Sequence, residues 1–321
     1  EICSALDSES DLDYFNITVG TSAGLVGSTH IVPPMEYETG YTAPISASIK
    51  SVVTKPIFVA GRINQPQIAE EILKMGQADM CGMTRAIISD PMMPLKAANG
   101  YLDDIRACVA CNQACIDHML NACSISCIQR PETGRELQYA NISKTKLKKS
   151  ILVAGGGPAG VKAACIAADR GHRVTLCEKS NSLGGQINLA QSLPGRSEFG
   201  GIITNLNKEL KKTTASVRFN SFVNLDLIEE LAPDVVIAAT GASPYMPKIQ
   251  GSEEAHVVNA WQVLEGKANV GGSVVIADWR CDWIGLGLAE LLVKHGCRVR
   301  LAVNGMVAGQ NIPQYARDAW I

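Results

Sequence analysis

The glycine-rich segment Gly155-Gly156-Gly157-Pro158-Ala159-Gly160 constrains the fold of this chain more than any other feature. It follows a short apolar run, Ile151 to Ala154, typical of a buried strand, and it precedes a helical pattern, Val161 to Arg170. Glycines at this spacing let the backbone approach a pyrophosphate, which the N–H groups and dipole of the helix N-terminus then bind. Glu178 ends the next predicted strand, about twenty residues on, where a carboxylate binds ribose hydroxyls. The sequence therefore predicts an adenine-dinucleotide site with contacts from Gly155, Gly157, Ala159, Gly160 and Glu178.

The first hundred residues alternate short apolar runs with helical patterns. Strands are predicted at Tyr14 to Val19, Pro56 to Ala60 and Ala78 to Met83, and helices at Gln67 to Met75 and at Met92 to Asn99, the second starting at Ser89-Asp90-Pro91. Strands that alternate with helices are expected to pair in parallel. Three such units are too few to close a barrel of eight, so this α/β region is expected to be part of a larger fold.

A second strand–helix–strand unit is predicted near the end of the chain. Strands at Ser273 to Ala277 and Arg298 to Val303 flank a helix at Gly285 to His295. The turn, residues 277–284, carries two tryptophans and two aspartates where a dinucleotide site needs glycines, and these side chains would crowd and repel a pyrophosphate. Gly285 and Gly287 come later, inside the predicted helix. Either NAD(P)H does not bind this unit, or the glycines have moved along the chain and kept their role.

Composition excludes two classes of function. The chain has 29 lysines and arginines against 31 acidic residues, a net charge of −2, which gives no electrostatic footprint for nucleic acid. No apolar run reaches the about 18 residues that a membrane span needs. The polar start lacks the pattern of a signal peptide, and we expect a cytoplasmic protein. Residue 1 is not Met, and Tyr315 to Ile321 reads as the middle of a helix, so the chain is expected to be a fragment.

Five of the eleven cysteines lie between Cys108 and Cys127. Four of them, separated by gaps of two, three and eleven residues, are candidate metal ligands: Cys108, Cys111, Cys115 and Cys127. The asymmetric set, three in a tight loop and one more distant, favours a four-iron cluster. Zinc is the first alternative, although zinc sites usually contain paired C-x2-C knuckles or histidine, and unligated structural cysteines are the second. The basic stretch Lys144 to Lys149 that follows is interpreted as a solvated linker.

The segment Cys108-Val109-Ala110-Cys111-Asn112-Gln113-Ala114-Cys115 with Cys127, preceded by Gly61-Arg62-Ile63-Asn64 and followed by the glycine turn, resembles the iron–sulfur flavoenzymes related to 2,4-dienoyl-CoA reductase and trimethylamine dehydrogenase. The resemblance runs over essentially the whole chain. It implies the C-terminal part of an FMN-binding (β/α)8 barrel in residues 1–100 and a [4Fe-4S] connector and linker in residues 101–149. Residues 150–321 would form an incomplete Rossmann-like FAD/NAD(P)-type domain with an inserted second dinucleotide-type unit.

The resemblance also implies which residues contact the flavins. Arg62, Thr84 and Arg85 match positions that contact FMN in relatives, although from the residues alone an ordinary salt bridge is the favoured role of each arginine. Gln186, Arg196 and Val223 match contacts of FAD, and Thr240-Gly241, after a strand predicted at Val235 to Ala239, matches a turn beside that cofactor. The amine dehydrogenases of the family hold ADP there instead. The first half of the barrel, which carries the catalytic tyrosine in relatives, is absent, so no catalytic residue is assigned.

These features predict an oxidoreductase in which FMN reacts with a small organic substrate and the cluster passes electrons to a second redox partner. The altered second turn favours amine oxidation or N-demethylation with an external electron-acceptor protein. The cysteine gaps favour the alternative, NAD(P)H-dependent reduction of a dienoyl-CoA or another enoate. An alternative of another class is a zinc-stapled nucleotide-binding or electron-carrier module.

Overall fold

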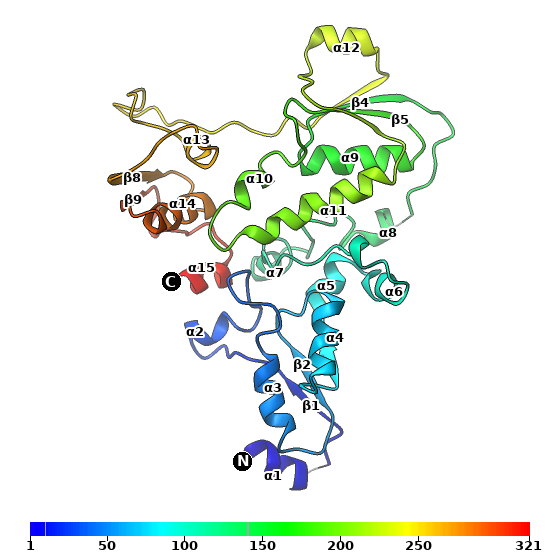
Figure 1. Ribbon diagram of the computed structural model, residues 1–321, viewed down its shortest axis with the longest axis vertical. Coiled ribbons are helices and arrows are strands. Elements are labelled where there is room, and N and C mark those ends of the chain that lie inside the picture. Colours follow the sequence, from blue (N-terminus) through cyan, green and yellow to red (C-terminus); the bar gives the residue numbers. More distant parts are fainter. Residues whose placement is uncertain (10, 140) are drawn as a thin grey trace. The chain divides into compact units, whose positions relative to one another are not determined.

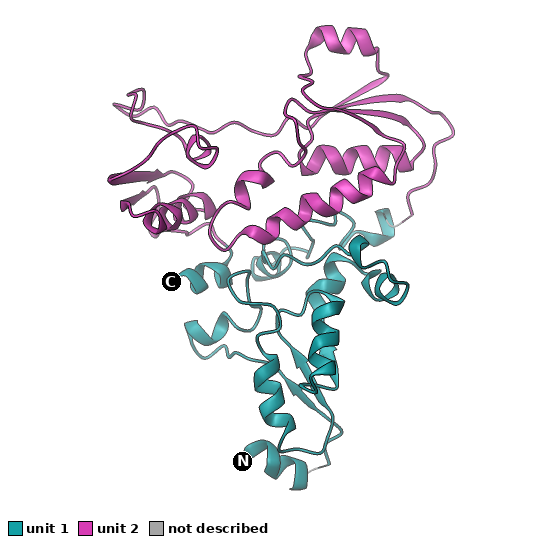
Figure 2. Ribbon diagram, viewed as in Figure 1, with its two compact units in different colours: residues 1–140, 313–321 teal, residues 141–312 magenta. Residues whose placement is uncertain are grey.

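The computed structural model describes residues 1–9, 11–139 and 141–321 (Figure 1). The chain forms two compact units, coloured separately in Figure 2. Unit 1 comprises residues 1–140 and 313–321, and unit 2 comprises residues 141–312.

Unit 1 is built on a parallel sheet of three strands in the order β1 (Phe15–Ile17), β2 (Ile57–Ala60) and β3 (Met80–Gly82). Phe15 pairs with Ile57, and Phe58 pairs with Met80. The three predicted strands and their parallel pairing are therefore confirmed, each strand being shorter than predicted. Ile57 and Val59 on β2 are fully buried, because β2 is the central strand and its alternate side chains enter the apolar core.

Two helices connect these strands, α3 (Ala43–Lys50) before β2 and α4 (Pro66–Lys74) before β3, and the second confirms the predicted helix. Helix α5 (Thr84–Ser89) follows β3 directly and was not predicted; it is only six residues long, and no side chain caps its start. Ser89 therefore ends a helix instead of starting one, and α6 begins at Met93. The remaining helices of unit 1 are α1 (Ile2–Glu9), α2 (Leu25–Ser28), α6 (Met93–Ala98), η1 (Leu102–Asp104), α7 (Ile116–Leu120), α8 (Glu136–Tyr139) and α15 (Gln314–Trp320).

Unit 2 contains a parallel sheet of four strands in the order β6 (Ser216–Arg218), β5 (Arg173–Cys177), β4 (Ser150–Ala154) and β7 (Val235–Ala238). Strand β4 lies in the middle and is almost completely buried, as its continuous apolar run predicts. Helix α9 (Pro158–Asp169) leaves β4 through the glycine turn and packs on the sheet, and α11 (Gly200–Lys211) packs against α9. The predicted strand–turn–helix–strand unit is confirmed.

A separate parallel pair, β8 (Ser273–Asp278) and β9 (Arg298–Val303), carries α14 (Trp283–Lys294) between its strands. This is the predicted second unit, and Gly285 and Gly287 lie inside its helix, as expected. The other helices of unit 2 are α10 (Ile187–Ala190), η2 (Ser197–Phe199), α12 (Leu225–Leu231) and α13 (Ala260–Leu264).

The compact units differ from the three predicted segments at two places. The described part of the connector up to residue 139 clusters with the strands of unit 1 and does not stand apart. The last residues, 313–321, also cluster with unit 1, because α15 packs against α2. Within the described ranges, the longest apolar helices fall short of what a membrane crossing requires.

Candidate functional site

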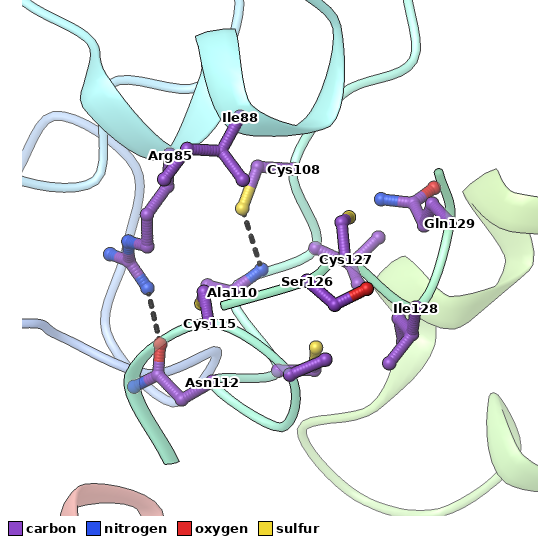
Figure 3. Close-up of a pocket in the computed structure, with 13 residues that line it drawn as sticks. Arg85, Ile88, Cys108, Ala110, Asn112, Cys115, Ser126, Cys127, Ile128 and Gln129 are labelled. Carbon is purple, nitrogen blue, oxygen red and sulfur yellow. Dashed lines mark hydrogen bonds between the residues drawn. The ribbon is translucent and has the colours of Figure 1, made fainter. Parts of the chain in front are cut away.

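The four predicted ligands, Cys108, Cys111, Cys115 and Cys127, line one cavity in unit 1 (Figure 3). Arg85 and the cysteine-loop residue Asn112 line the same cavity, together with Gln129 and several apolar side chains. Cys123, which the sequence left over, is exposed and lies outside it. The spacing of the cysteines thus corresponds to a real convergence in space.

The tight loop is held in shape by its own backbone. Ala110 (φ 48°) and Asn112 (φ 57°) adopt left-handed conformations, which turn the chain sharply twice. The amide of Ala110 donates a hydrogen bond to Cys108 Sγ at 3.4 Å. The amide of Ser126 donates to the carbonyl of Ala114 at 2.6 Å, and this bond brings the distant Cys127 to the loop.

Two amide side chains, one before the cysteine loop and one after it, fix the start of the loop. Asn64 Nδ2 donates to the carbonyl oxygen of Cys108 at 2.8 Å. Gln129 Nε2 donates to the carbonyl of Ala107 at 2.9 Å, and its Oε1 is buried without a hydrogen-bond partner. Gln129 is 6% exposed and lines the cavity, so an unsatisfied polar atom lies in the wall of the space that the cysteines surround.

Burial governs the electrostatics of these thiols. Desolvation raises the pKa of Cys111 to about 12, and it also raises the pKa of Cys108 and Cys115. Each thiolate would repel the others, whereas the charge of Arg85 acts on Cys108 and Cys115 in the opposite direction. Thiolates are the ligand form of cysteine, so a positively charged metal centre would be needed to hold all four ionised together.

Two kinds of metal centre can be compared with these cysteines. Within the described part of the chain, no three His, Cys, Asp or Glu side chains are arranged to hold a single metal ion. A zinc ion needs its ligands to converge at about 2.3 Å on one centre. A four-iron cluster takes one thiolate at each iron and leaves the sulfurs further apart. Four cysteines, three in a tight loop and one more distant, are the kind of donor set that would hold a four-iron cluster.

The ends of β2 and β3 carry the residues predicted to contact FMN. Arg62 follows β2 in a left-handed conformation (φ 53°), is 5% exposed, and donates from Nε to the carbonyl of Tyr37 at 2.9 Å. Thr84 begins α5 and is exposed. Burial raises the pKa of Tyr41, although the positive charges of Arg85 and Arg62 act to lower it. Both guanidinium groups therefore lie near enough to Tyr41 for their charges to act on it.

The glycine turn in unit 2 has the geometry of an anion site. Gly155 has φ 107°, and a Cβ at Gly160 would lie 1.9 Å from the carbonyl oxygen of Gly155. Gly157 is the N-cap of α9, no side chain caps this helix, and a Cβ at Gly157 would meet nothing within 4 Å. The helix start is therefore uncapped by side chains and has open space beside Gly157, as an anion site requires.

Glu178 lies beside this turn. Its Oε2 accepts the amide of Gly156 at 2.7 Å, and its Oε1 accepts the amide and hydroxyl of Ser180 at 2.8 Å. Burial raises the pKa of Glu178, but these hydrogen bonds outweigh it and the net pKa is lowered. The carboxylate is thus held ionised at the edge of the predicted ribose site.

The other predicted dinucleotide contacts occupy different surroundings. Gln186 donates from Nε2 to the carbonyl of Ala242 at 3.4 Å, next to the Thr240-Gly241 turn. Val223 lies between β6 and α12, partly exposed. Arg196 is 2% exposed, and its guanidinium lies 3.3 Å from the ring centre of Trp283, the first residue of α14. Arg196 therefore makes a cation–π contact with the start of α14, the helix between β8 and β9.

The corresponding turn between β8 and α14 is filled by side chains. Asp282 caps α14 by accepting the amide of Ile284 at 3.0 Å. Asp278, at the end of β8, accepts the amides of Arg280 and Cys281 at 3.2 and 2.9 Å. A Cβ at Gly285 would lie 2.3 Å from Asp278 Cγ. Carboxylates of the protein thus occupy the helix N-terminus that a pyrophosphate would need, which confirms the crowding expected from the sequence.

Sequence reasoning missed the supporting residues Asn64, Asn112 and Gln129. Asn64 and Asn112 lie within motifs that the sequence analysis quotes, and both are buried. An amide side chain inside each motif was therefore the one sequence signal that could have pointed to a supporting role. Their partners lie 22 to 80 residues away along the chain, and no local pattern identifies such pairs.

Comparison with known proteins adds a family context. Residues 26–104 match the model of the NADH:flavin oxidoreductase / NADH oxidase family, and residues 149–305 match that of the pyridine nucleotide-disulphide oxidoreductases. The chain is 36% identical to an NADH oxidase of Thermoanaerobacter brockii over 87% of this chain and 44% of that protein. It is 32% identical to an N,N-dimethylglycine/sarcosine dehydrogenase of Chromohalobacter salexigens over 99% of this chain and 48% of that protein.

Among solved structures, a 2-naphthoyl-CoA reductase in complex with 2-naphthoyl-CoA matches with a TM-score of 0.90 and 31% identity, covering 99% of this chain and 48% of that one. The chain thus spans about half the length of the relatives it matches.

Proposed function

Because the chain belongs to the NADH:flavin oxidoreductase / NADH oxidase family, and is therefore part of a flavin oxidoreductase, we propose that the full protein oxidises a small N-methylated amine. FMN supplies hydride acceptance in this proposal, and a [4Fe-4S] cluster supplies one-electron transfer to an acceptor protein. Arg62 and Arg85 would neutralise the FMN phosphate, and the four cysteines of the cavity would hold the cluster.

One observation carries the choice of electron acceptor. The N-terminus of α9 is free of side-chain caps and faces open space, whereas that of α14 is capped by Asp282 and begins with Trp283. An anionic cofactor is therefore favoured at α9 and repelled at α14. On this basis FAD or ADP binds at the glycine turn before α9, and NAD(P)H does not bind at the turn before α14. Electrons then leave through the cluster.

The similarity to an N,N-dimethylglycine/sarcosine dehydrogenase supports the amine substrate. The similarities to an NADH oxidase and to a 2-naphthoyl-CoA reductase support a second candidate, NAD(P)H-driven reduction of an enoate or an acyl-CoA thioester. The reductase-like cysteine gaps favour this second candidate as well. The asymmetric spacing of the four cysteines, without paired C-x2-C knuckles, favours a cluster over a zinc-stapled module.

Anaerobic mixing of the purified full-length protein separates the two enzymatic candidates. We expect the visible flavin absorption to bleach with N,N-dimethylglycine or sarcosine and to persist with NADPH or NADH. Rapid bleaching by a nicotinamide cofactor, with no response to either amine, would show that the amine proposal is wrong.

Iron analysis tests the cluster independently. Cys111→Ala removes one of the four thiols in the cavity and should abolish cluster binding. Cys123→Ala is the matched control, because that cysteine is exposed and lies outside the cavity, and it should keep the iron content of the parent protein. Equal iron in both variants would contradict the ligand assignment, and zinc in place of iron would support the non-enzymatic module.

A further inference from the structure

Arg85 is fixed at the cysteine cavity and not only at the flavin end of the barrel. Its Nη1 donates to Asn112 Oδ1 at 2.7 Å (Figure 3). Its Nη2 donates to the carbonyl of Pro33 at 2.8 Å. The side chain lines the same cavity as the four cysteines. The planar guanidinium is thus held by two acceptors in a fixed orientation, with further N–H groups still available.

The acceptor on the cluster loop is itself rigid. Asn112 is 1% exposed, adopts a left-handed backbone conformation, and donates from Nδ2 to the carbonyl of Val32 at 2.8 Å. Both oxygens that hold Arg85 therefore belong to ordered, hydrogen-bonded segments. The guanidinium cannot leave the cavity wall without breaking two hydrogen bonds in a partly buried place, so its charge is a permanent part of the site.

A cluster held by four thiolates becomes more negative when it accepts an electron. A nearby positive charge in a partly buried site stabilises that reduced state more than the oxidised one, because the local dielectric screens the interaction less than water does. Hydrogen bonds and net charge around the cluster are the terms by which a protein sets its reduction potential.

We propose that Arg85 is a positioning residue that raises the reduction potential of the cluster and so makes the cluster a better acceptor of electrons from the flavin. This inference rests on the proposed function, since it requires the cluster to be present. It gives Arg85 a role at the cysteine cavity in addition to the phosphate contact predicted from the sequence.

The test uses the purified full-length protein and a redox titration of the cluster signal by electron paramagnetic resonance. Arg85→Gln removes the charge and should disfavour the reduced cluster by about tenfold or more, a shift of about 59 mV to lower potential for a one-electron couple. Arg85→Lys keeps the charge and should stay closer to the parent potential. Iron and FMN contents are measured for each variant.

Arg130→Gln is the matched control. Arg130 lies in the same region of unit 1 and does not line the cavity, and its charge is paired with Glu132 and Glu136. Removing this charge should leave the cluster potential unchanged. A shift equal to that of Arg85→Gln would mean that net charge alone, and not the placement of Arg85, sets the potential.

Asn112→Asp provides a second route if Arg85→Gln does not retain iron. It places a carboxylate at the atom that Arg85 contacts, and aspartate tolerates the left-handed backbone. The potential should fall in the same direction with Arg85 still in place. Unchanged potentials in the iron-containing variants overturn the inference, even if FMN is lost, whereas absence of iron from the parent protein overturns the proposed function and the inference with it.

Discussion

Replacing Gly160 by alanine gives the sharpest test of the dinucleotide turn. The new Cβ would lie 1.9 Å from the carbonyl oxygen of Gly155, so the turn or the start of α9 must move by about 1.1 Å to restore a 3.0 Å separation. The obstacle is backbone and cannot rotate away. Overpacking of this kind costs about 1–3 kcal/mol, which corresponds to a loss of roughly 3–10 °C in Tm for a unit of this size.

The matched control is Gly157→Ala, three positions earlier in the chain. Its φ of −72° suits any residue, and its Cβ would meet no atom within 4 Å. Alanine is a weaker N-cap than glycine, so we expect a loss of at most about 1 kcal/mol. The open space at Gly157 is where the pyrophosphate would lie, and this variant should therefore keep its fold and lose its dinucleotide.

Thermal unfolding followed by circular dichroism, together with chromatography of the released nucleotide, distinguishes these outcomes. Gly160→Ala should lose both stability and nucleotide, and Gly157→Ala should lose nucleotide alone. A Gly160→Ala protein that unfolds at the parent temperature and releases a full equivalent of FAD or ADP would refute the reasoning.

Three further predictions concern unit 2. The lowered pKa of Glu178 contributes stability that is fully present above its ordinary pKa of 4.5 and is lost as the pH falls through the lowered value. Glu178→Gln should therefore lose less stability in acid than the parent protein does. Urea unfolding between about pH 3 and 6 measures this. Asn259→Ala removes a capping box at α13 and should cost about 0.5–2 kcal/mol by the same assay, and an unchanged midpoint would contradict the cap. Gly285→Ala should destabilise the protein by about 1–3 kcal/mol because its Cβ meets Asp278, and the added substitution Asp278→Ala should recover part of that loss in a double-mutant cycle.

Features that depend on neighbouring residues were predictable from the sequence. The strands β2, β4 and β9, the helix α4 and the glycine turn follow from apolar periodicity and from backbone freedom at glycine, which act over a few residues. The crowded turn before α14 was predictable for the same reason, since Asp278 and Asp282 bond to amides within three residues.

Contacts between distant segments were decided only by the tertiary structure. Arg85 bonds to acceptors 27 and 52 residues away, and α15 packs against α2 from the far end of the chain. Helix α5 has only six residues, too few for apolar periodicity or helix propensity to predict it, and it forms where the chain leaves β3. Local spacing in the sequence therefore predicts the kinds of site in this protein. The structure determined which side chains share them, because the enthalpy of a hydrogen bond depends on atoms that meet only after folding.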